Sequence, residues 1–298
     1  MKTNKIAILM STYNGEKYIR NQLDSLLKQK DVNIEIIIRD DGSKDNTVKI
    51  IKEYINKNDN IKLIGDNKNL GYAYSFWYIL RNIDDKYDYY AFCDQDDIWD
   101  EKKIISAIKK IEKYENIPAL YTSRVVSVNN DMEVINENTF SCNRVLNKYE
   151  SFQKSVVPGC VFVFNRQAKQ LVSVYNGYLE SHDWATYAIV NSFGKVVYDN
   201  NSYIKYRIHD NNAIGKKNKL GMLVIKIKRF FKKSKCVRSK FAKDFYETYL
   251  NYIDDKKYKD SIEELAYYKK SINLKRRLIF NRKYKGIVFK IYVLLSKV

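Results

Sequence analysis

"YDYYAFCDQDDIWD", residues 87–100, is the stretch that decides the fold. It begins as an aromatic, apolar run typical of a buried β-strand, and it then places four acids within the seven positions from Asp94 to Asp100. Acids at this position lie at the carboxyl end of the strand. Either they form a solvated turn that leads into the next helix, or they surround a positively charged ligand.

Two earlier strand-like runs also end in polar clusters. Residues 5–11 lead into Ser11, Tyr13 and Asn14, and the run from residue 33 leads into Asp40–Ser43. Helical periodicity separates the strands, over residues 15–29, 44–56, 73–82 and 101–114. This alternation predicts an α/β fold, with a mostly parallel, Rossmann-like sheet flanked by helices. Ligands bind beyond the carboxyl ends of such strands, so the three polar clusters predict one shared cleft.

The pattern becomes mixed after Pro118. Further elements are expected in the second half of this domain: strands near 119–128, 159–164 and 195–208, and a helix over 184–192.

Basic charge is concentrated at the carboxyl end of the 298-residue chain, whose net charge is +19. Residues 1–215 hold 29 Lys and Arg against 28 Asp and Glu, a net charge of +1, whereas residues 216–298 hold 25 against 7, a net charge of +18. This change predicts a boundary near Gly215. We expect a catalytic domain over residues 1–215 and a basic α-helical extension over residues 216–298.

Cysteine usage and hydropathy indicate an intracellular protein. The four cysteines are far apart and form no CxxC pair, which is typical of reduced thiols rather than a disulfide framework or a zinc site. The apolar run from Ile6 to Met10 is too short for a signal peptide. No uncharged stretch approaches the ~20 apolar residues that span a bilayer. We expect a cytoplasmic protein.

The D-Q-D of residues 94–96 has the chemistry of a divalent-cation site. Carboxylate oxygens suit Mg²⁺ or Mn²⁺, which also take oxygens from substrate phosphates. Asp96, Asp97 and Asp100 can equally cap the helix expected over 101–114. The short motif alone leaves both interpretations open.

Four motifs taken together resemble the family 2 nucleotide-sugar glycosyltransferases, in their order and spacing: "ILMSTYNGEKYIRNQLDSLLKQ", "IIIRDDGSKDNT", "NKNLGYAYSF" and "AFCDQDDIW". The match covers roughly residues 4–215, and it implies the GT-A fold. "SHDW" (181–184) and "YRIHDNNAIG" (206–215) are most similar to bacterial rhamnosyltransferase-type members, which build surface polysaccharides.

The resemblance implies a nucleotide site. Ser11, Thr12 and Tyr13 match the first nucleotide-contacting loop, where backbone groups and the aromatic ring meet the base. Asp41 matches the acid that hydrogen-bonds the pyrimidine, and Gly71 lies in the loop that shields the nucleotide.

A metal site is implied as well. Asp94 matches the acid that faces the ribose and the metal, and Asp96 matches the direct metal ligand. Asp97 is the usual additional acid, which we expect to cap a helix or to support the ligands. His209 matches a position that supplies a metal ligand in many GT-A enzymes, although a lone histidine is often only structural.

Asp183 matches the catalytic base of the family. The family usually has Glu or another polar residue before this acid, and here His182 precedes it. A positioned carboxylate can take the proton of an acceptor hydroxyl. The competing interpretation is that Asp183 caps the helix expected over 184–192.

These residues predict an inverting, Mg²⁺- or Mn²⁺-dependent glycosyltransferase. Its donor would be a dTDP- or UDP-sugar, with dTDP-rhamnose preferred, and its acceptor a polysaccharide or a lipid-linked glycan. A Mg²⁺-dependent nucleotidyl- or phosphotransferase is an alternative that uses the same acids, although "STYNGEKY" offers no Gly-rich phosphate loop. A non-enzymatic adaptor explains the basic extension but not the acidic strand ends.

The extension combines Lys and Arg with apolar residues at helical spacing, as in residues 220–235. Basic amphipathic helices bind anionic membrane surfaces, so we expect a peripheral location on the inner face of the cell membrane. Nucleic-acid binding is the competing interpretation of the charge. The extension shows no known nucleic-acid-binding motif, and we expect no nucleic-acid partner. A solvated, lysine-rich helical hairpin is the third possibility.

Overall fold

The computed structural model describes residues 4–66, 68–139, 144–154, 158–209 and 236–298. They separate into two compact units. Unit 1 spans residues 1–145, 156–173 and 181–209, and unit 2 spans residues 146–155, 174–180 and 210–298. The boundary predicted near Gly215 and the helix predicted over 220–235 lie outside the described residues.

Unit 1 is built on a seven-stranded sheet with the strand order β10-β6-β9-β4-β1-β2-β3. Its strands are β1 (Lys5–Thr12), β2 (Asn33–Asp40), β3 (Ile61–Leu63), β4 (Tyr89–Cys93), β6 (Ala119–Ser123), β9 (Val163–Asn165) and β10 (Lys195–Asp199). All neighbours pair in parallel except β9, which is antiparallel to both β4 and β6. The predicted mostly parallel α/β fold is therefore confirmed.

Strand register brings the polar clusters to one edge of this sheet. Thr12 lies opposite Asp40 on β2, and Met10 lies opposite Cys93 on β4. The residues that follow these strands therefore leave the sheet side by side. Residues Ile6–Met10 are fully buried, as expected of a parallel strand that is covered on both faces.

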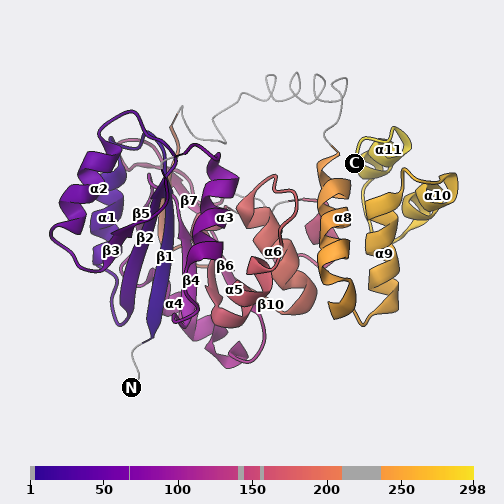
Figure 1. The fold of residues 1–298 in the computed structure, drawn as a ribbon, viewed down its shortest axis with the longest axis horizontal. Helices are drawn as coiled ribbons and strands as arrows, with labels where there is room; N and C mark the ends of the chain where they lie inside the picture. Colours follow the sequence, from indigo (N-terminus) through magenta and orange to yellow (C-terminus); the bar gives the residue numbers. More distant parts are fainter. Residues whose placement is uncertain (1–3, 67, 140–143, 155–157, 210–235) are drawn as a thin grey trace. The chain divides into compact units, whose positions relative to one another are not determined.

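Helices flank this sheet: α1 (Ile19–Leu27), α2 (Thr47–Ile55), α3 (Tyr72–Asn82), α4 (Lys103–Ile111), α5 (Arg166–Ser173) and α6 (His182–Phe193). In Figure 1, α1 and α2 lie to the left of the strands and α3 lies to their right. Helices α3, α5 and α6 contact one another. Short 3-10 turns follow α4 and precede β9, at Glu112–Tyr114 and Gly159–Val161.

A second sheet of four short strands was not predicted. Its order is β5-β11-β7-β8, with β5 at Ile98–Trp99, β7 at Val126–Val128, β8 at Val134–Asn136 and β11 at Ile204–Arg207. The strands predicted near 119–128 and 195–208 are each divided between the two sheets. At this division the Arg124 N–H donates to the Asp199 carbonyl at 3.0 Å, as the chain passes from β6 to β7.

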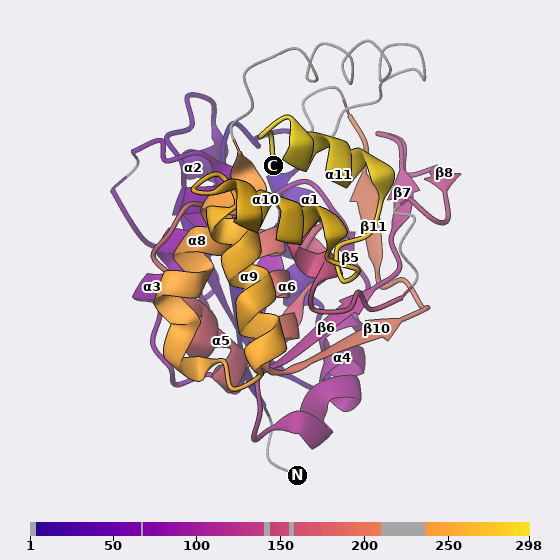
Figure 2. The ribbon, with the colours of Figure 1, turned by 90° about the vertical axis from the view of Figure 1, so that its right-hand side faces the viewer.

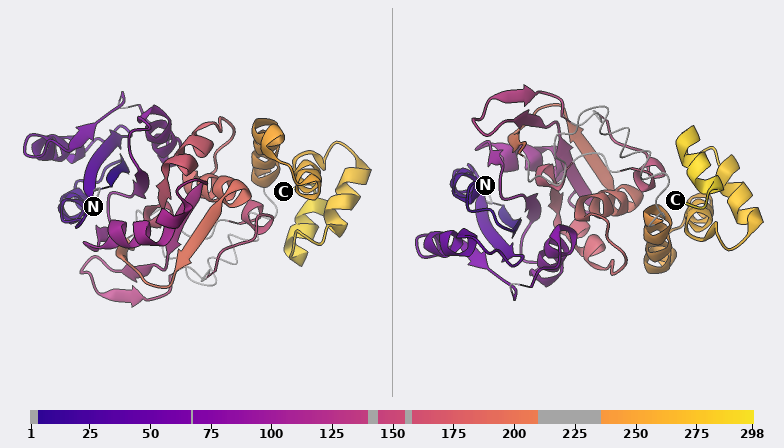
Figure 3. Two further views of the ribbon diagram at one scale, coloured as in Figure 1. Left: turned by 90° about the horizontal axis from the view of Figure 1, so that it is seen from below. Right: turned by 90° about the horizontal axis from the view of Figure 1, so that it is seen from above.

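Unit 2 is helical, and the predicted α-helical extension is confirmed over its described part. Its helices are α8 (Val237–Tyr249), α9 (Lys256–Tyr267), α10 (Ile272–Phe280) and α11 (Ile287–Leu294), with 3-10 turns at Glu150–Phe152 and Leu250–Tyr252. Figure 2 shows α8 and α9 side by side, and Figure 3 shows all four helices, orange to yellow, as one group.

Local sequence sets the starts of two of these helices. Asp255 accepts the Tyr258 N–H before α9, and Ser271 accepts the Leu274 N–H before α10, which satisfies amides that a helix start leaves unpaired. No helix in the described part of the chain is both long and apolar enough to cross a bilayer.

Candidate active site

Gln95 of the acidic motif holds the first loop, Tyr13–Gly15, by two hydrogen bonds. The Gln95 amide accepts the Tyr13 N–H and donates to the Tyr13 carbonyl, both at 2.9 Å. A Cβ on Gly15 would lie 2.2 Å from Gln95 Oε1, so this close approach requires glycine. The Tyr13 ring is 47% exposed and is free to stack on a base. The sequence reasoning missed Gln95, and its place between the two acids was the only signal.

The hydroxyls that precede this loop are used within the protein. Ser11 Oγ donates to Ser75 Oγ at 2.6 Å, and Thr12 Oγ1 donates to Asp40 at 2.9 Å. These bonds tie the end of β1 to α3 and β2. Both side chains are therefore engaged within the protein, and the contact of Ser11 and Thr12 with a nucleotide stays a prediction.

Asp41 and Gly71, both predicted to contact the nucleotide, lie together. The buried Asp41 carboxylate accepts the Leu70 N–H at 2.7 Å, the Gly71 N–H at 2.9 Å and the Arg39 guanidinium at 2.6 Å. Gly71 has φ +79°, a backbone conformation that favours glycine. The fully buried Arg39 also donates to the Lys68 carbonyl at 2.6 Å, so one cation fixes the whole loop. The sequence reasoning missed Arg39, a lone cation in an isoleucine-rich strand.

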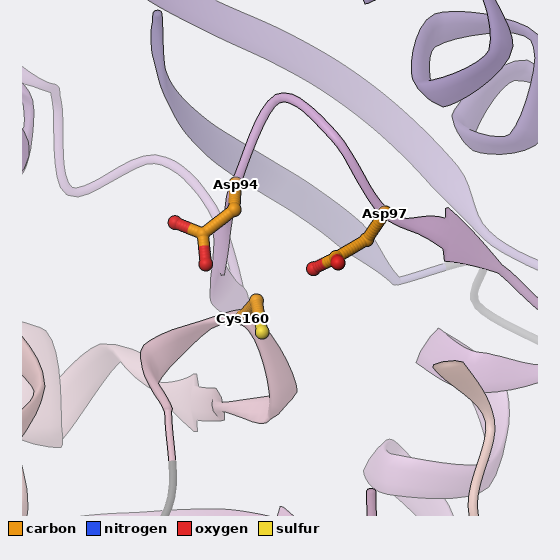
Figure 4. A group of neighbouring side chains, drawn as sticks. All are labelled: Asp94, Asp97 and Cys160. Atoms are coloured by element: carbon orange, nitrogen blue, oxygen red, sulfur yellow. The ribbon is translucent and has the colours of Figure 1, made fainter. Parts of the chain in front are cut away.

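Two of the acids converge with a thiol. Figure 4 shows Asp94, Asp97 and Cys160, whose ligand atoms lie within 4.8 Å of one another. Asp97 is fully buried; its Oδ1 accepts the Arg207 N–H at 3.0 Å, and its Oδ2 has no hydrogen-bond partner among the described residues. The prediction that Asp97 begins or caps the next helix is wrong, because α4 begins only at Lys103.

The acids raise one another's pKa values. Burial, followed by the charges of Asp96 and Asp183, raises the pKa of Asp94 to about 7. Burial, Asp96 and Asp94 hold the pKa of Asp97 well above its ordinary value. A cation bound among these acids would offset their mutual repulsion.

Asp96 lies against His209, the other predicted metal ligand. His209 Nε2 lies 2.9 Å from Asp96 Oδ2, and its ring stacks on Tyr18 at a centroid distance of 4.8 Å. Arg207, at the end of β11, donates to the Asp96 carbonyl at 2.9 Å and to the Asn130 carbonyl at 2.9 Å. His209, which follows β11 of the small sheet, thus lies beside the acids that follow β4 of the large sheet.

The structure brings the predicted ligands together only in part: Asp94 lies with Asp97 and Cys160, and Asp96 lies against His209. Asp94, Asp96 and His209 offer carboxylate oxygens and an imidazole nitrogen, which suit Mn²⁺ and, through their oxygens, Mg²⁺. Burial raises the pKa of the Cys160 thiol well above its ordinary value, so the neighbouring sulfur is protonated as long as no ion is bound beside it.

The predicted base, Asp183, lies in the first turn of α6. Its Oδ1 accepts the Trp184 N–H at 2.6 Å, and its negative charge is favourable at a helix N-terminus. Because its charge also raises the pKa of Asp94, Asp183 belongs to the same electrostatic cluster as the predicted metal ligands.

His182 packs in an aromatic pocket beside Asp183. Its ring stacks on Phe76 at 4.0 Å and meets the edge of Phe92 at 4.8 Å. Burial lowers the pKa of His182 to about 4, and neither ring nitrogen has a hydrogen-bond partner in the described part of the chain. His182 is therefore neutral at pH 7.

A family model described as Glycosyl transferase family 2 matches residues 7–171, more than half of the chain. The chain belongs to this family. A relative from Shigella flexneri, the dTDP-rhamnosyl transferase RfbG, is 32% identical over 217 residues, which cover 69% of this chain and 73% of the relative. The putative glycosyltransferase EpsE of Bacillus subtilis is 31% identical over 123 residues, which cover 41% of this chain and 44% of the relative.

Solved structures of glycosyltransferases share the fold. S. aureus TarS 1–349 in complex with UDP-GlcNAc has a TM-score of 0.59 at 16% identity, covering 98% of this chain and 88% of that one. The mannosyltransferase PcManGT from Pyrobaculum calidifontis, in complex with GDP-Man and Mn²⁺, has a TM-score of 0.53 at 14% identity. The match covers 99% of this chain and 80% of that one. The predicted family and GT-A fold are confirmed. The chain is a glycosyltransferase, which disfavours the nucleotidyltransferase and adaptor alternatives.

In this family 2 glycosyltransferase, Gly159→Ala is expected to disturb the predicted base. An added Cβ would lie 2.6 Å from His182 Nε2 and 3.2 Å from Asp183 Cβ, so both side chains must shift. We expect sugar transfer to fall by about 100-fold, because small displacements of reacting groups have effects of this size. Steady-state kinetics measure the loss of sugar transfer, and thermal unfolding measures the effect of the clash on stability.

The double variant Gly159→Ala/His182→Ala is the control, since it removes the nearer of the two clashing groups. Activity should recover in part. If the single variant transfers sugar at the wild-type rate, then Gly159 does not position Asp183.

Neutral His182 is expected to make the folded state sensitive to acid. Its unfolded pKa is about 6.5 and its folded pKa is about 4, so below pH 6.5 the unfolded state binds a proton that the folded state does not. Stability should fall as the pH decreases through this window, by up to about 1.4 kcal/mol per pH unit. Urea unfolding of the wild type and of His182→Phe between pH 7 and pH 4 measures the difference. Equal slopes in the two proteins would contradict a buried, neutral His182.

Proposed function

We propose that this family 2 glycosyltransferase is an inverting, metal-dependent enzyme that transfers rhamnose from dTDP-rhamnose to a polysaccharide or lipid-linked acceptor. The observation that carries the proposal is electrostatic. After burial, the charges of Asp96 and Asp183 both raise the pKa of Asp94, which supports a site that combines a proton acceptor with a cation-binding pair. The proposed reaction needs a proton acceptor at the acceptor hydroxyl and a cation at the departing diphosphate.

The nucleoside would bind between the first loop and the Asp41 loop. Backbone groups of Ser11 and Thr12 and the exposed ring of Tyr13 would contact the base and ribose. Asp41 already holds the Leu70 and Gly71 amides, and its remaining lone pairs would accept from the pyrimidine.

Asp94, Asp96 and His209 would hold the divalent cation. When bound, Mg²⁺ or Mn²⁺ neutralises the negative charge of the departing diphosphate. Because Asp96 and His209 contact each other, both side chains would be close enough to bind the same cation. Asp97 would support this arrangement by fixing the backbone of Arg207.

Asp183 would act as the general base. It takes the proton of the acceptor hydroxyl while that oxygen forms its bond to the anomeric carbon, and the bond from this carbon to the diphosphate oxygen breaks on the opposite face. The configuration inverts in this single displacement, so no covalent enzyme intermediate is needed.

The choice of donor rests on a relative. The similar protein from Shigella flexneri is a dTDP-rhamnosyl transferase, and its alignment covers 69% of this chain. This supports thymine as the base and rhamnose as the sugar.

The C-terminal residues 216–298 would bring the enzyme to its acceptor. Their net charge of +18 favours the anionic inner face of the cell membrane, where lipid-linked glycans are assembled. We therefore propose a peripheral membrane location, with residues 1–215 as the catalytic domain.

Donor hydrolysis tests the catalytic proposal. The protein is incubated with Mn²⁺ and a panel of dTDP-, UDP- and GDP-sugars, and released nucleoside diphosphate is measured. We expect turnover with dTDP-rhamnose, and loss of that turnover on chelation of the metal. Turnover with another donor alone would overturn the rhamnose assignment, and turnover that persists without divalent metal would overturn the metal dependence.

A further inference from the structure

Helix α11 is apolar on two opposite sides. On its inner side, Phe289 is 8% exposed and Val293 is fully buried in unit 2. On its outer side, large apolar side chains face solvent at 40–76% exposure: Ile287, Val288, Ile291, Leu294 and the adjoining Leu295. A helix that only covers a core has one apolar side, so the outer side needs a separate explanation.

The outer residues form one stripe. Their positions, i, i+1, i+4, i+7 and i+8, fall within an arc of roughly 120° at 100° per residue. We call this stripe, Ile287 to Leu295, the α11 face. Figure 2 shows α11 lying beside α10, whose residues Ile272 and Phe280 are also exposed, at 63% and 78%.

Cations are frequent in the segment that carries the α11 face, and three of them lie at the start of the helix. Residues 271–298 contain eight Lys and Arg and no Asp or Glu. A cavity of about 450 Å³ lies at the start of α11, lined by Arg282, Tyr284, Lys285, Gly286, Ile287 and Lys290. Among the described residues, none forms an ion pair with the three cations of this lining. The positive charge here is therefore available to an external anion.

We propose that the α11 face and this cation-lined cavity form a membrane-docking surface that binds an anionic phospholipid bilayer. The apolar stripe enters the boundary between headgroups and acyl chains, and the cavity receives a lipid phosphate. An apolar stripe bordered by cations is the pattern of helices that lie in a membrane interface.

A second copy of the chain is a poorer occupant. Pairing two such surfaces would bring Arg282, Lys285 and Lys290 of the cavity lining against the same cations of the other copy. An anionic bilayer offsets that charge and also takes up the apolar side chains. Charge complementarity therefore selects the lipid.

The inference deepens the proposed peripheral location and rests on it, but it does not depend on the proposed donor. It replaces a diffuse attraction of the whole basic extension by one defined surface. Donor hydrolysis and membrane binding are separate measurements, so either proposal can fail without the other.

Vesicle sedimentation of the full chain tests it. The vesicles are phosphatidylcholine alone, or phosphatidylcholine mixed with phosphatidylglycerol. Ile287→Ser/Ile291→Ser/Leu294→Ser removes the stripe, and Arg282→Gln/Lys285→Gln/Lys290→Gln removes the cavity cations. Lys256→Gln/Lys257→Gln/Lys259→Gln removes three lysines of α9 and is the control matched in charge.

We expect the wild type and the α9 control to bind the anionic vesicles and not the neutral ones. The cavity variant should bind about 100-fold more weakly, because each cation near the surface contributes about fivefold. The stripe variant should also lose about 100-fold, because the apolar contact is gone. Unchanged circular dichroism spectra and donor hydrolysis verify that both variants are folded.

Four results would overturn the proposal. One is equal weakening in the α9 control, which would mean diffuse charge attraction. Another is wild-type binding by the stripe variant. The third is a dimer in sedimentation velocity that the stripe variant abolishes without any change in vesicle binding. Inorganic phosphate should not displace the protein from vesicles at matched ionic strength, and displacement would mean a site for free phosphate instead.

Discussion

Replacing Asp183 by Asn is expected to reduce kcat for sugar transfer by about 10²–10⁴-fold, the range that general-base catalysis contributes. Asn keeps the size of the side chain and can still accept the Trp184 N–H, but it cannot take a proton from the acceptor. Removing the charge also removes one cause of the raised pKa of Asp94, so cation binding should not weaken. Initial rates with donor and acceptor, together with titration of dTDP, separate the two effects.

Asp131→Asn is the control, since Asp131 is an exposed acid of the same unit. It should leave both rate and affinity unchanged. A variant at Asp183 that lost dTDP affinity and kept its kcat would show that Asp183 binds the donor and does not act as the base.

Replacing Asp96 by Asn is expected to abolish the gain in dTDP affinity that Mn²⁺ produces in the wild type, and to slow transfer by about 100-fold or more. The change removes one anionic ligand and weakens the contact that holds His209. Calorimetric titration of dTDP, with Mn²⁺ and with chelator, measures the effect. In Asp96→Asn the two titrations should coincide. If the Mn²⁺-dependent gain survives, another group binds the cation.

The edge of the large sheet could be predicted from the sequence because it depends on short-range patterns. Buried apolar runs followed by polar residues, with helical periodicity between them, determine parallel strands and the edge at which they end. The observed register places Thr12 beside Asp40, as this logic requires. The meeting of Asp41 with Gly71, and of Asp96 with His209, agrees with the predicted grouping.

A strand near residues 159–164 was predicted, but the antiparallel direction of β9 could not be predicted from its three residues. Because it runs against β4 and β6, its amino end lies at the carboxyl ends of its neighbours. That reversal brings Gly159 and Cys160 to the acids, although the sequence offers only an apolar run. Apolar periodicity carries no information about strand direction.

Asp97 shows a second limit. An acid directly before a short strand resembles a helix cap, and only the long-range bond to the Arg207 amide reveals its role. The small sheet that supplies this bond consists of strands of two to four residues, which are too short for a periodic signal.

Gln95 has a consequence for the order of events in the site. By bonding both backbone groups of Tyr13, it joins the loop that would meet the nucleoside to the two acids that would meet the cation. We therefore expect the two binding free energies to be coupled, and by thermodynamic linkage each ligand must raise the affinity of the other by the same factor. Gln95→Ala should bring that factor, measured by titrating Mn²⁺ and dTDP in either order, closer to one. An unchanged factor would mean that the phosphates alone carry the coupling.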